Sequence, residues 1–412
     1  MNVHMRLGFH APQTGEDLAA LVAAAAGSGT PIEVRGRGSK IDVGRPLQTA
    51  AIVSTEAMVG VSLYEPTELV LSAQAGTPVA DIEVLLAEYG QEFAFEPLDL
   101  GPALGFEPGQ TSIGAMLATN LSGARRVLAG AVRDHALGVK AVNGRGELFK
   151  AGGRVMKNVT GYDLSRALAG SWGTLAVVTE VTLKVLPARQ EARTILCFGL
   201  PDATAVEAMR LATGTPFEVS GAVHLQKDLV ARLSDPAVAG AGKPVTALRV
   251  ENFASSVRYR ASRLKELLAA YNPDAELDTA RSHAFWNELR GLKMFCAKPE
   301  RPLWRICTAA SGAARLVAAI ARTLDTQAFY DWGGSLIWLE TSPILDGGAI
   351  EMRRSLAEFG GHATLIRADA MTRASIDVFQ PLDAPLMALS QRLKAAFDPY
   401  GILNPGRMYP ET

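Results

Sequence analysis

Apolar and polar positions near the start of the chain follow two spacings, one typical of helices and one of strands. The Ala-rich apolar run 18–26 follows the capping hydroxyl of Thr14 and reaches Gly27, which predicts an amphipathic helix between these two residues. The apolar-leaning stretch 32–34 then predicts a short strand that runs directly into glycines. The chain therefore opens with a helix, a strand and a glycine-rich loop.

A second unit has a strand followed by a helix. Residues 68–74 predict the strand, and the helix is capped by Thr77, has Pro78 at its first position and stops at Gly90. Further along, the sequence N-G-R-G at 143–146 separates two alternating apolar and polar stretches, a strong signal for a β-hairpin. These elements indicate a domain in which helices and strands are mixed.

The pattern changes after Pro187, which ends a strand predicted over 176–186. Before it, residues 158–164 lead into a short helix. From Ala192 onward strands alternate with helices, which indicates an α+β domain with one sheet and helices on a face. The predicted elements there are 194–198, 203–211, 221–225, 245–250 and 255–270.

Two glycine-rich loops carry the clearest chemical signal. The stretches 35–40 and 108–114 each place glycines beside small hydroxyl residues, a composition that lets backbone N–H groups curl around an anion, and basic side chains add charge to the first. Ordinary turns between strands would have the same composition. Neither loop matches the P-loop motif G-x-x-x-x-G-K-[ST], and no G-x-G-x-x-G opens a helix, so neither of these standard nucleotide sites is supported.

Composition excludes several classes of protein. The chain has 412 residues, 41 basic against 42 acidic, and 48% hydrophobic positions, which suits two or three domains and argues against nucleic-acid binding. The most apolar stretch, 18–26, is far shorter than the roughly 20 residues needed to cross a bilayer. The N-terminus lacks the pattern of a signal peptide, so we expect a cytoplasmic protein.

The three cysteines, Cys197, Cys296 and Cys307, are an odd number and lie far apart. They lack the clustered spacing of zinc or iron–sulfur ligands, and we expect buried free thiols. If the protein does redox chemistry, electrons cannot leave through a cluster in this chain.

Aromatic and basic residues in the second domain supply further candidates. Trp332 stands in D-W-G-G, where two glycines permit close approach to a flat ring, whereas the other tryptophans there are expected in the core. Arg305, Arg367 and His362 are candidate partners for a carboxylate substrate, because a guanidinium matches a carboxylate bidentately. Exposed arginines and a turn histidine explain them equally well. His135 is as consistent with a structural role as with a functional one.

Six motifs, in order, resemble the FAD-binding domain of the vanillyl-alcohol oxidase/PCMH superfamily over roughly residues 30–188. They are R-G-R-G-S, P-G-Q-T-S-I-G-A, A-T-N-L-S-G, R-D-H-A-L-G-V-K-A-V, G-Y-D-L-S-R-A-L-A-G-S-W-G-T-L and V-T-E-V-T-L-K-V-L-P. The resemblance implies an α+β fold in which FAD lies extended between two α+β subdomains. It also implies three parts: a PCMH-type FAD-binding domain (1–188), an α+β cap domain (189–375) and a C-terminal segment that returns to the flavin (376–412).

The same resemblance assigns cofactor-binding residues by position. Those expected at the phosphates are Arg35, Gly36, Arg37, Gly38, Ser39, Lys40, Pro108, Gly109, Thr111, Ser112, Gly114 and Ala115. Those expected on the flavin side are Ala118, Thr119, Asn120, Ser122 and Gly123, and on the adenosine side Gly173, Val177 and Val178. The tail motif at 397–408 places Asn404 near the cofactor. Relatives with covalent FAD often carry a histidine where Ser39 and Lys40 stand here, so we expect non-covalent FAD.

Over nearly its whole length the chain resembles the family of bacterial glycolate oxidase E subunits, through W-N-E-L-R-G-L, P-L-W-R, D-W-G-G and F-D-P-Y-G-I-L-N-P-G-R-M. This implies a complex with a related FAD-binding subunit and an iron–sulfur subunit. Such a complex oxidises a small 2-hydroxy acid, glycolate or D-lactate, and passes electrons towards the respiratory chain. Through these partners the chain would lie peripherally at the inner face of the membrane.

One departure bears on catalysis. Related 2-hydroxy-acid dehydrogenases carry G-H-x-G-D-G-N-x-H, whereas this chain has only G-G-H-A-T-L at 360–365. A lone histidine does not supply the three or so protein ligands of a catalytic metal, so we expect no metal site and assign no catalytic residue. A self-sufficient FAD-dependent oxidase and a flavin-stabilised structural subunit remain alternatives.

Overall fold

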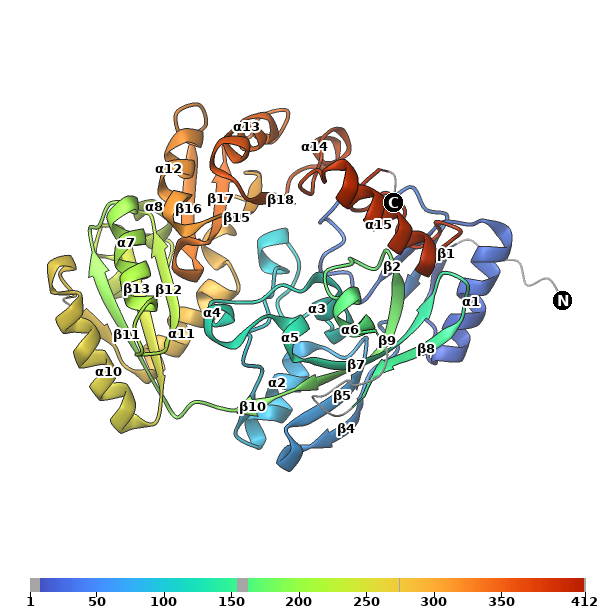
Figure 1. Ribbon diagram of the computed structural model, residues 1–412, viewed down its shortest axis with the longest axis horizontal. Helices are drawn as coiled ribbons and strands as arrows, with labels where there is room; N and C mark the ends of the chain where they lie inside the picture. The colour runs from blue at the N-terminus through green and yellow to red at the C-terminus, as the bar shows by residue number, and fades with distance from the viewer. Residues whose placement is uncertain (1–7, 154–161, 274, 411–412) are drawn as a thin grey trace.

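The computed structural model describes residues 8–153, 162–273 and 275–410, so Gly161 and the stretch 158–160 of the predicted helix entrance lie outside the described residues. The chain forms two lobes side by side (Figure 1). One contains the N-terminal half together with the C-terminal tail, and the other contains an eight-stranded sheet, here called the cap sheet.

A three-stranded parallel sheet opens the N-terminal lobe. Its strands are, in spatial order, β1 (Gly8–His10), β3 (Ala51–Ser54) and β2 (Ile32–Arg35). Helix α1 (Gly15–Ser28) is capped by Thr14, whose hydroxyl accepts from the amide of Asp17, as predicted. The predicted end at Gly27 is wrong, because the helix continues to Gly29, whose left-handed backbone (φ 62°) provides the stop.

The second sheet of this lobe has five antiparallel strands. In spatial order they are β4 (Val61–Glu65), β5 (Val70–Gln74), β9 (Ala176–Lys184), β7 (Ala136–Asn143) and β8 (Leu148–Gly152). The predicted hairpin is confirmed, with Val142 opposite Leu148 and the side chain of Asn143 accepting from two amides of the turn. The strand predicted from residue 68 starts only at Val70, because Leu69 is left-handed (φ 58°).

Short helices connect and cover these strands. They are η1 (Pro66–Glu68), α2 (Val79–Glu88), η2 (Pro102–Leu104), α3 (Ile113–Thr119), α4 (Arg126–Ala129), α5 (Val132–His135) and α6 (Leu164–Leu168), and a small ladder pairs β6 (Gln91–Glu92) with β10 (Leu186–Pro187). Thr77 does not cap α2 as predicted. Its hydroxyl donates instead to the carbonyl of Gln74 (2.7 Å), and Pro78 stands at the cap position.

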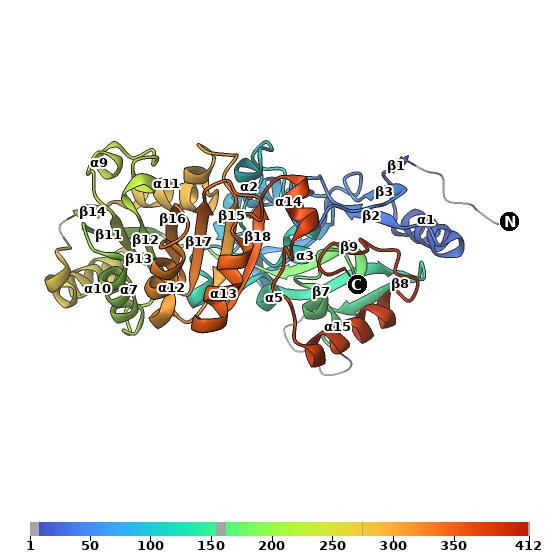
Figure 2. The same ribbon diagram turned by 90° about the horizontal axis from the view of Figure 1, so that it is seen from above.

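The cap sheet is antiparallel throughout. Its spatial order is β14 (Ala275–Leu277), β11 (Glu191–Phe198), β13 (Val245–Asn252), β12 (Val219–Leu225), β16 (Thr326–Asp331), β17 (Leu336–Thr341), β15 (Leu303–Cys307) and β18 (His362–Arg367). Helices α7 (Asp202–Thr213), α10 (Ala254–Leu267), α12 (Ala310–Ile320) and α13 (Ala349–Phe359) form a row along one face (Figure 2).

The remaining cap elements are short or lie towards the other lobe. They are α8 (Lys227–Val230), α9 (Pro236–Ala239), η3 (Ala269–Tyr271), α11 (Thr279–Arg290), η4 (Lys293–Phe295) and η5 (Trp332–Gly334). The alternation of strands and helices predicted after Ala192 is confirmed. The predicted tryptophan core is also found, since Trp286, Trp304 and Trp338 are buried.

The C-terminal tail crosses back to the N-terminal lobe. After α14 (Ala370–Ser375), helix α15 (Ala384–Phe397) lies beside β8 (Figure 2), and the ring of Phe397 packs on that of Phe149, with 6.0 Å between the centroids. Leu403 then bridges Ile32 of β2, and both side chains are buried in one cluster with α1. The N-terminal lobe is therefore completed by residues from the end of the chain.

The two lobes share a continuous apolar core. The largest buried cluster is built on the cap sheet and also takes in Leu98, Leu121 and Trp172 of the N-terminal lobe. Such shared burial resists relative movement of the lobes. In the part of the chain that the structure describes, no helix is long and apolar enough to cross a membrane.

Candidate cofactor site

The two glycine-rich loops meet in space. A Cβ on Gly36 would collide with the hydroxyl of Ser112, which shows how closely the loops approach. Across the same contact, the Arg37 guanidinium donates to Oε1 of Gln110 (3.1 and 3.2 Å) and Lys40 Nζ donates to the Thr111 hydroxyl (2.7 Å). Stretches about 70 residues apart in sequence thus form one surface.

The backbone of the first loop is arranged as an anion site requires. Gly38 and Gly109 take positive φ values of 80° and 76°, so each loop reverses sharply. Among the hydrogen bonds between described residues, none is donated by the backbone N–H groups of residues 36–40. Amides without a protein acceptor are available to a phosphate, so the loops fit the pyrophosphate of FAD.

Lys40 adds an unusual charge to this surface. Its side chain is buried, and burial lowers its pKa to about 8, although Asp99 partly opposes the effect. Asp99 also accepts from the amide of Gly109 (2.7 Å) and from the hydroxyl of Thr111 (3.1 Å), which holds the second loop in place. A lysine whose charge is costly in this place would be stabilised by a bound anion.

The residues after the second loop are packed rather than open. Ser112 caps α3 by accepting from the amide of Ala115 (3.4 Å), and the amide of Gly114 donates to the carbonyl of Ala75 (2.9 Å). The hydroxyl of Thr119 donates to the carbonyl of Ala115. Pro108, by contrast, is exposed. Of these predicted phosphate residues, Thr111 and Ser112 contact the first loop, whereas Gly114 is pressed against Ala75, the residue after β5.

The segment 118–123, predicted for the flavin side, lies under two tryptophans. The carbonyl of Ala118 accepts from the amide of Trp172 (2.9 Å), and the carbonyl of Gly123 accepts from the indole N–H of Trp332 (2.9 Å). The side chains of Asn120, left-handed at φ 51°, and Ser122 accept from backbone amides of α5. Trp332 of the cap therefore closes on the segment that was singled out for the flavin.

Asn404 ties the predicted adenosine side to the first loop. Its side chain is fully buried, accepts from the amide of Val34 (2.7 Å) and donates to the carbonyls of Val34 (3.1 Å) and Trp172 (2.9 Å). Gly173 packs directly against it, and Val177 and Val178 are buried in β9. The amide of Asn404 is thus used to hold strand β2 and the 170–175 loop together.

The candidate carboxylate partners separate into different roles. Arg367 is buried and donates to the carbonyls of four residues, which braces the junction of the lobes and leaves it neither exposed nor free for a substrate. Arg305 is also buried, contrary to the alternative of an exposed arginine. His362 is exposed and hydrogen-bonds the thiol of Cys307. The prediction of three buried thiols is confirmed for Cys197 alone, because Cys296 and Cys307 are half-buried.

His135 has a structural environment. Its Nε2 lies 2.8 Å from the carbonyl of Ala129, its ring packs on Phe95 at 5.1 Å, and burial lowers its pKa. Within the described residues, no group of three or more His, Cys, Asp or Glu side chains is placed to hold a metal ion.

A cluster of buried charges joins the two lobes and was missed from the sequence, because its members lie far apart along the chain. Its members are Glu92, Glu96, Arg125, Arg189, Arg249 and Glu251. Arg125 of the N-terminal lobe donates two hydrogen bonds to Glu251 of the cap sheet (2.6 and 2.9 Å). Bidentate pairs of this kind fix the orientation of the two lobes and also stabilise the contact between them.

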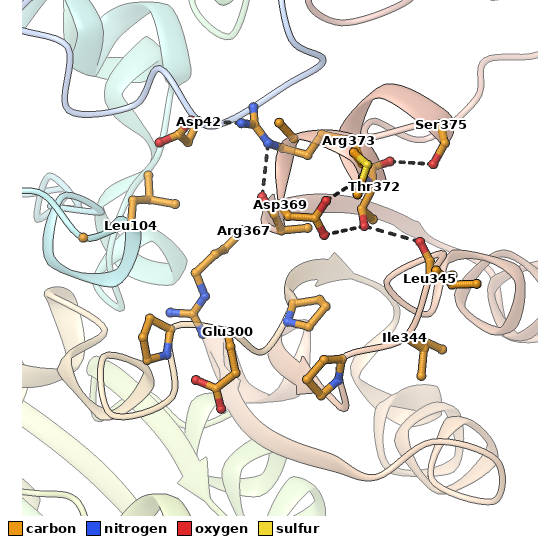
Figure 3. A pocket seen from close by; sticks show the side chains of 17 residues that line it. Asp42, Leu104, Glu300, Ile344, Leu345, Arg367, Asp369, Thr372, Arg373 and Ser375 are labelled. Carbon is orange, nitrogen blue, oxygen red and sulfur yellow. Dashed lines mark hydrogen bonds and ion pairs between the residues drawn. The ribbon is translucent and has the colours of Figure 1, made fainter.

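A cavity of about 1090 Å³ lies elsewhere on the junction. Asp42 and Leu104 of the N-terminal lobe face Ile344, Leu345 and the 367–375 segment of the cap (Figure 3). Its arginines are already engaged, since Arg373 pairs with Asp42 (2.9 Å). None of the residues 36–40 or 108–115 lines it, so this cavity is distinct from the paired loops.

Comparison with known proteins agrees with this geometry. A family model described as FAD binding domain matches residues 7–152. The glycolate oxidase subunit GlcE of Escherichia coli (strain K12) is 33% identical over 382 residues, covering 93% of each chain. A D-lactate dehydrogenase of Archaeoglobus fulgidus is 30% identical over 199 residues, which cover 48% of this chain and 42% of the dehydrogenase.

The fold is shared with a solved structure of p-cresol methylhydroxylase with substrate bound. The two superpose with a TM-score of 0.75 over 100% of this chain and 92% of the other, at 13% identity. The predicted α+β fold of the PCMH type and the predicted FAD cofactor are confirmed.

Proposed function

We propose that this chain, which belongs to the GlcE family of FAD-binding glycolate oxidase subunits, binds FAD non-covalently as one subunit of a 2-hydroxy-acid oxidoreductase complex. The observation that carries the proposal is the contact between the loops 36–40 and 108–112, with free amides on the first loop and the buried Lys40 between them. This arrangement suits a pyrophosphate.

The described side chains have separate tasks in this proposal. The amides of 36–40 and Lys40 hold the pyrophosphate, while Ser39 and Lys40 offer no histidine for a covalent bond to the flavin. Asn404 keeps the first loop aligned with the 170–175 loop, and Trp332 excludes water from the 118–123 segment. When bound, FAD supplies a two-electron acceptor for oxidation of an alcohol to a carbonyl.

The substrate and partner assignments rest on the relatives. Because the Escherichia coli protein is described as a glycolate oxidase subunit and the Archaeoglobus fulgidus protein as a D-lactate dehydrogenase, we assign glycolate or D-lactate to the complex. The partners would be a related FAD-binding subunit and an iron–sulfur subunit that receives the electrons. We place the complex at the cytoplasmic face of the membrane, held there by its partners.

The proposed division of labour follows the predicted domains. Residues 1–188 would bind FAD, 189–375 would cap the flavin, and 376–412 would return to the FAD domain. The eight strands of the cap sheet, all between Glu191 and Arg367, and the position of α15 support this division.

An absorbance spectrum of the purified chain, before and after acid precipitation, tests the cofactor. Yellow colour released into the supernatant is expected for non-covalent flavin. A colourless protein that cannot be reconstituted with FAD would refute the proposal, and colour that stays in the pellet would refute the non-covalent attachment.

Anaerobic addition of glycolate and D-lactate then tests the role within a complex. The proposal predicts that steady turnover to an electron acceptor requires the two partner subunits. Full turnover by this chain alone would identify a self-sufficient oxidase instead. Unchanged activity of a complex in which this chain's flavin cannot be reduced would identify a structural subunit.

A further inference from the structure

Two arginines from different lobes converge on the ring of Trp332. The guanidinium carbon of Arg126, in α4, lies 4.3 Å from the ring centroid, and that of Arg305, in β15, lies 5.2 Å from it. Arg305 also lies 5.9 Å from the ring of Trp338, its neighbour across β15 and β17. The two lobes thus place two positive charges beside one aromatic ring.

Neither guanidinium has a carboxylate partner. Among the ion pairs and hydrogen bonds between described residues, none involves the side chain of Arg126 or Arg305. Arg305 is only 9% exposed, and its Nε is fully buried with no acceptor. A buried charge without a partner is costly, and nearly every other buried arginine here donates to carboxylates or carbonyls.

The positive charge of the two arginines shifts the pKa values of neighbouring groups. Burial lowers the pKa of Arg126, and the charge of Arg305 lowers it further. Burial opposes ionisation of Cys307, yet the hydrogen bond with His362 and the charges of Arg305 and Arg126 lower the pKa of this thiol. Among the described residues, the Asp331 carboxyl forms no ion pair with Arg126 or Arg305, and burial raises its pKa to about 7.

The position of the pair limits what can bind. Trp332 is tied through its indole N–H to Gly123, so the arginines stand beside the segment assigned to the flavin. Arg305 and Cys307 share one face of β15, and exposure increases from Arg305 to Cys307 and to His362 opposite it. Arg126 is itself half-buried, so the pair lies between the buried part of β15 and the surface.

We propose that Arg126, Arg305 and Trp332 form a binding site for the carboxylate group of a small 2-hydroxy or 2-oxo acid. This rests on the proposed function, since it places a substrate-class ligand beside the flavin segment of this chain. The two guanidiniums supply charge-assisted hydrogen bonds, and the Trp332 ring holds them in position.

Binding of oxamate, a 2-oxo acid analogue that a flavin does not oxidise, tests the site. The full chain reconstituted with FAD is titrated in about 0.1 M salt, with tryptophan fluorescence and calorimetry as readouts. We expect saturable binding that Arg305→Gln and Arg126→Gln each weaken by about ten- to hundredfold, the value of a charge-assisted hydrogen bond. Neutral glycolamide, which lacks the carboxylate, should bind far more weakly.

The matched control is Arg315→Gln. Arg315 lies 5.7 Å from the ring of Phe359 on the outer helices of the cap, so it loses the same kind of contact away from the site, and oxamate binding should be unchanged. Arg126 is only half-buried, so Arg126→Gln supplies the test if Arg305→Gln does not fold.

The outcomes separate this inference from the proposed function. A chain that holds FAD but does not bind oxamate, or binds it equally well in both variants, overturns the carboxylate site and leaves FAD binding intact. Binding of glycolamide as tightly as oxamate also overturns it. A chain that cannot take up FAD refutes the proposed function, whereas oxamate binding by that chain would still support the site.

Discussion

Replacing Arg125 by methionine should loosen the junction between the lobes. Arg125 is 7% exposed and donates to Glu251 through Nε (2.9 Å) and Nη2 (2.6 Å), and to Glu92 through Nη1 (2.9 Å). Methionine keeps much of the apolar stem and removes the charge. The substitution therefore tests the ionic contacts across the junction with little change in packing.

The expected loss in the free energy of unfolding follows from the charges that remain in the cluster. The cluster holds three carboxylates and three guanidiniums, and the substitution leaves three against two. Glu251, whose side chain is fully buried, keeps Arg249 and Ser220 as partners. Breaking a buried pair on one side costs about 3–5 kcal/mol. We expect a loss near the lower end of this range, because Arg249 still compensates part of the charge.

The free energy of unfolding, measured in urea through tryptophan fluorescence, is the readout. The ring of Trp286 lies 4.3 Å from the Arg249 guanidinium and reports on the cluster directly. The control is Arg263→Met, because Arg263 forms an exposed pair with Glu266 one turn along α10 and its loss should cost less than about 1 kcal/mol.

A double variant separates charge from packing. Arg125→Met with Glu251→Gln restores two carboxylates against two guanidiniums, so its cost should be smaller than the sum of the single costs by about 1 kcal/mol or more. A loss below about 1 kcal/mol for Arg125→Met, or strict additivity in the double variant, would refute the reasoning. Burial opposes ionisation of Glu251, but Arg249 and Arg125 hold its pKa low, so the cluster's contribution to stability should begin to fall below about pH 4.5 and be lost progressively on further acidification.

Three further substitutions test the cofactor site and the cap. Gly36→Ala should reduce the FAD content of the purified chain, because the new methyl group meets the Ser112 hydroxyl, whereas Gly27→Ala, with open space in α1, should leave FAD content unchanged and stability equal or higher by up to about 1 kcal/mol. The pKa of Lys40 is about 8, so its charge is lost between about pH 7 and 9; the Kd for FAD should rise several-fold over that range, and Lys40→Met should weaken binding at pH 7 and abolish this pH dependence. The carboxyl of Asp331 has a folded pKa of about 7 against 3.8 for an unperturbed group, so ionisation should cost on the order of 4 kcal/mol of stability, absent below about pH 4 and complete above pH 7. Asp331→Asn should remove this loss in urea unfolding measured at pH 5 and pH 8, and an unchanged pH dependence would contradict it.

The cap sheet shows why some functional residues escape sequence reasoning. Arg305 was a candidate from its residue type alone, with an exposed arginine as the alternative. Arg126 carried only a weak signal, its position three residues after Gly123. The ring of Trp332 brings both into one site, and no spacing in the sequence relates residues 126, 305 and 332.

Arg367 illustrates the opposite error. Its residue type suited a carboxylate ligand, yet it donates to the carbonyls of Ala103, Phe295, Arg301 and Lys298 and braces the junction. A guanidinium has five donors that serve carbonyls as well as carboxylates. Which of the two it meets depends on chain segments that lie far away in sequence.

Local patterns by themselves determined much about this protein. The cap at Thr14, the hairpin at 143–146, the strand that runs into the first glycine loop and the alternation after Ala192 depend on neighbouring residues, and the sequence was sufficient for them. The fold and FAD were predicted through the resemblance of the ordered motifs to a known family, because neither glycine-rich loop alone identifies a ligand. Element ends were less certain, as the extension of α1 to Gly29 shows.

Only the tertiary structure decided which distant residues meet. It placed Lys40 against Thr111, Asn404 against Val34, and Arg125 against Glu251, and it left the two arginines beside Trp332 without partners. The physical reason is that burial and pairing of charges depend on long-range packing, which no local periodicity encodes. Contacts within the N-terminal lobe and between the lobes alike join residues that lie far apart in the sequence.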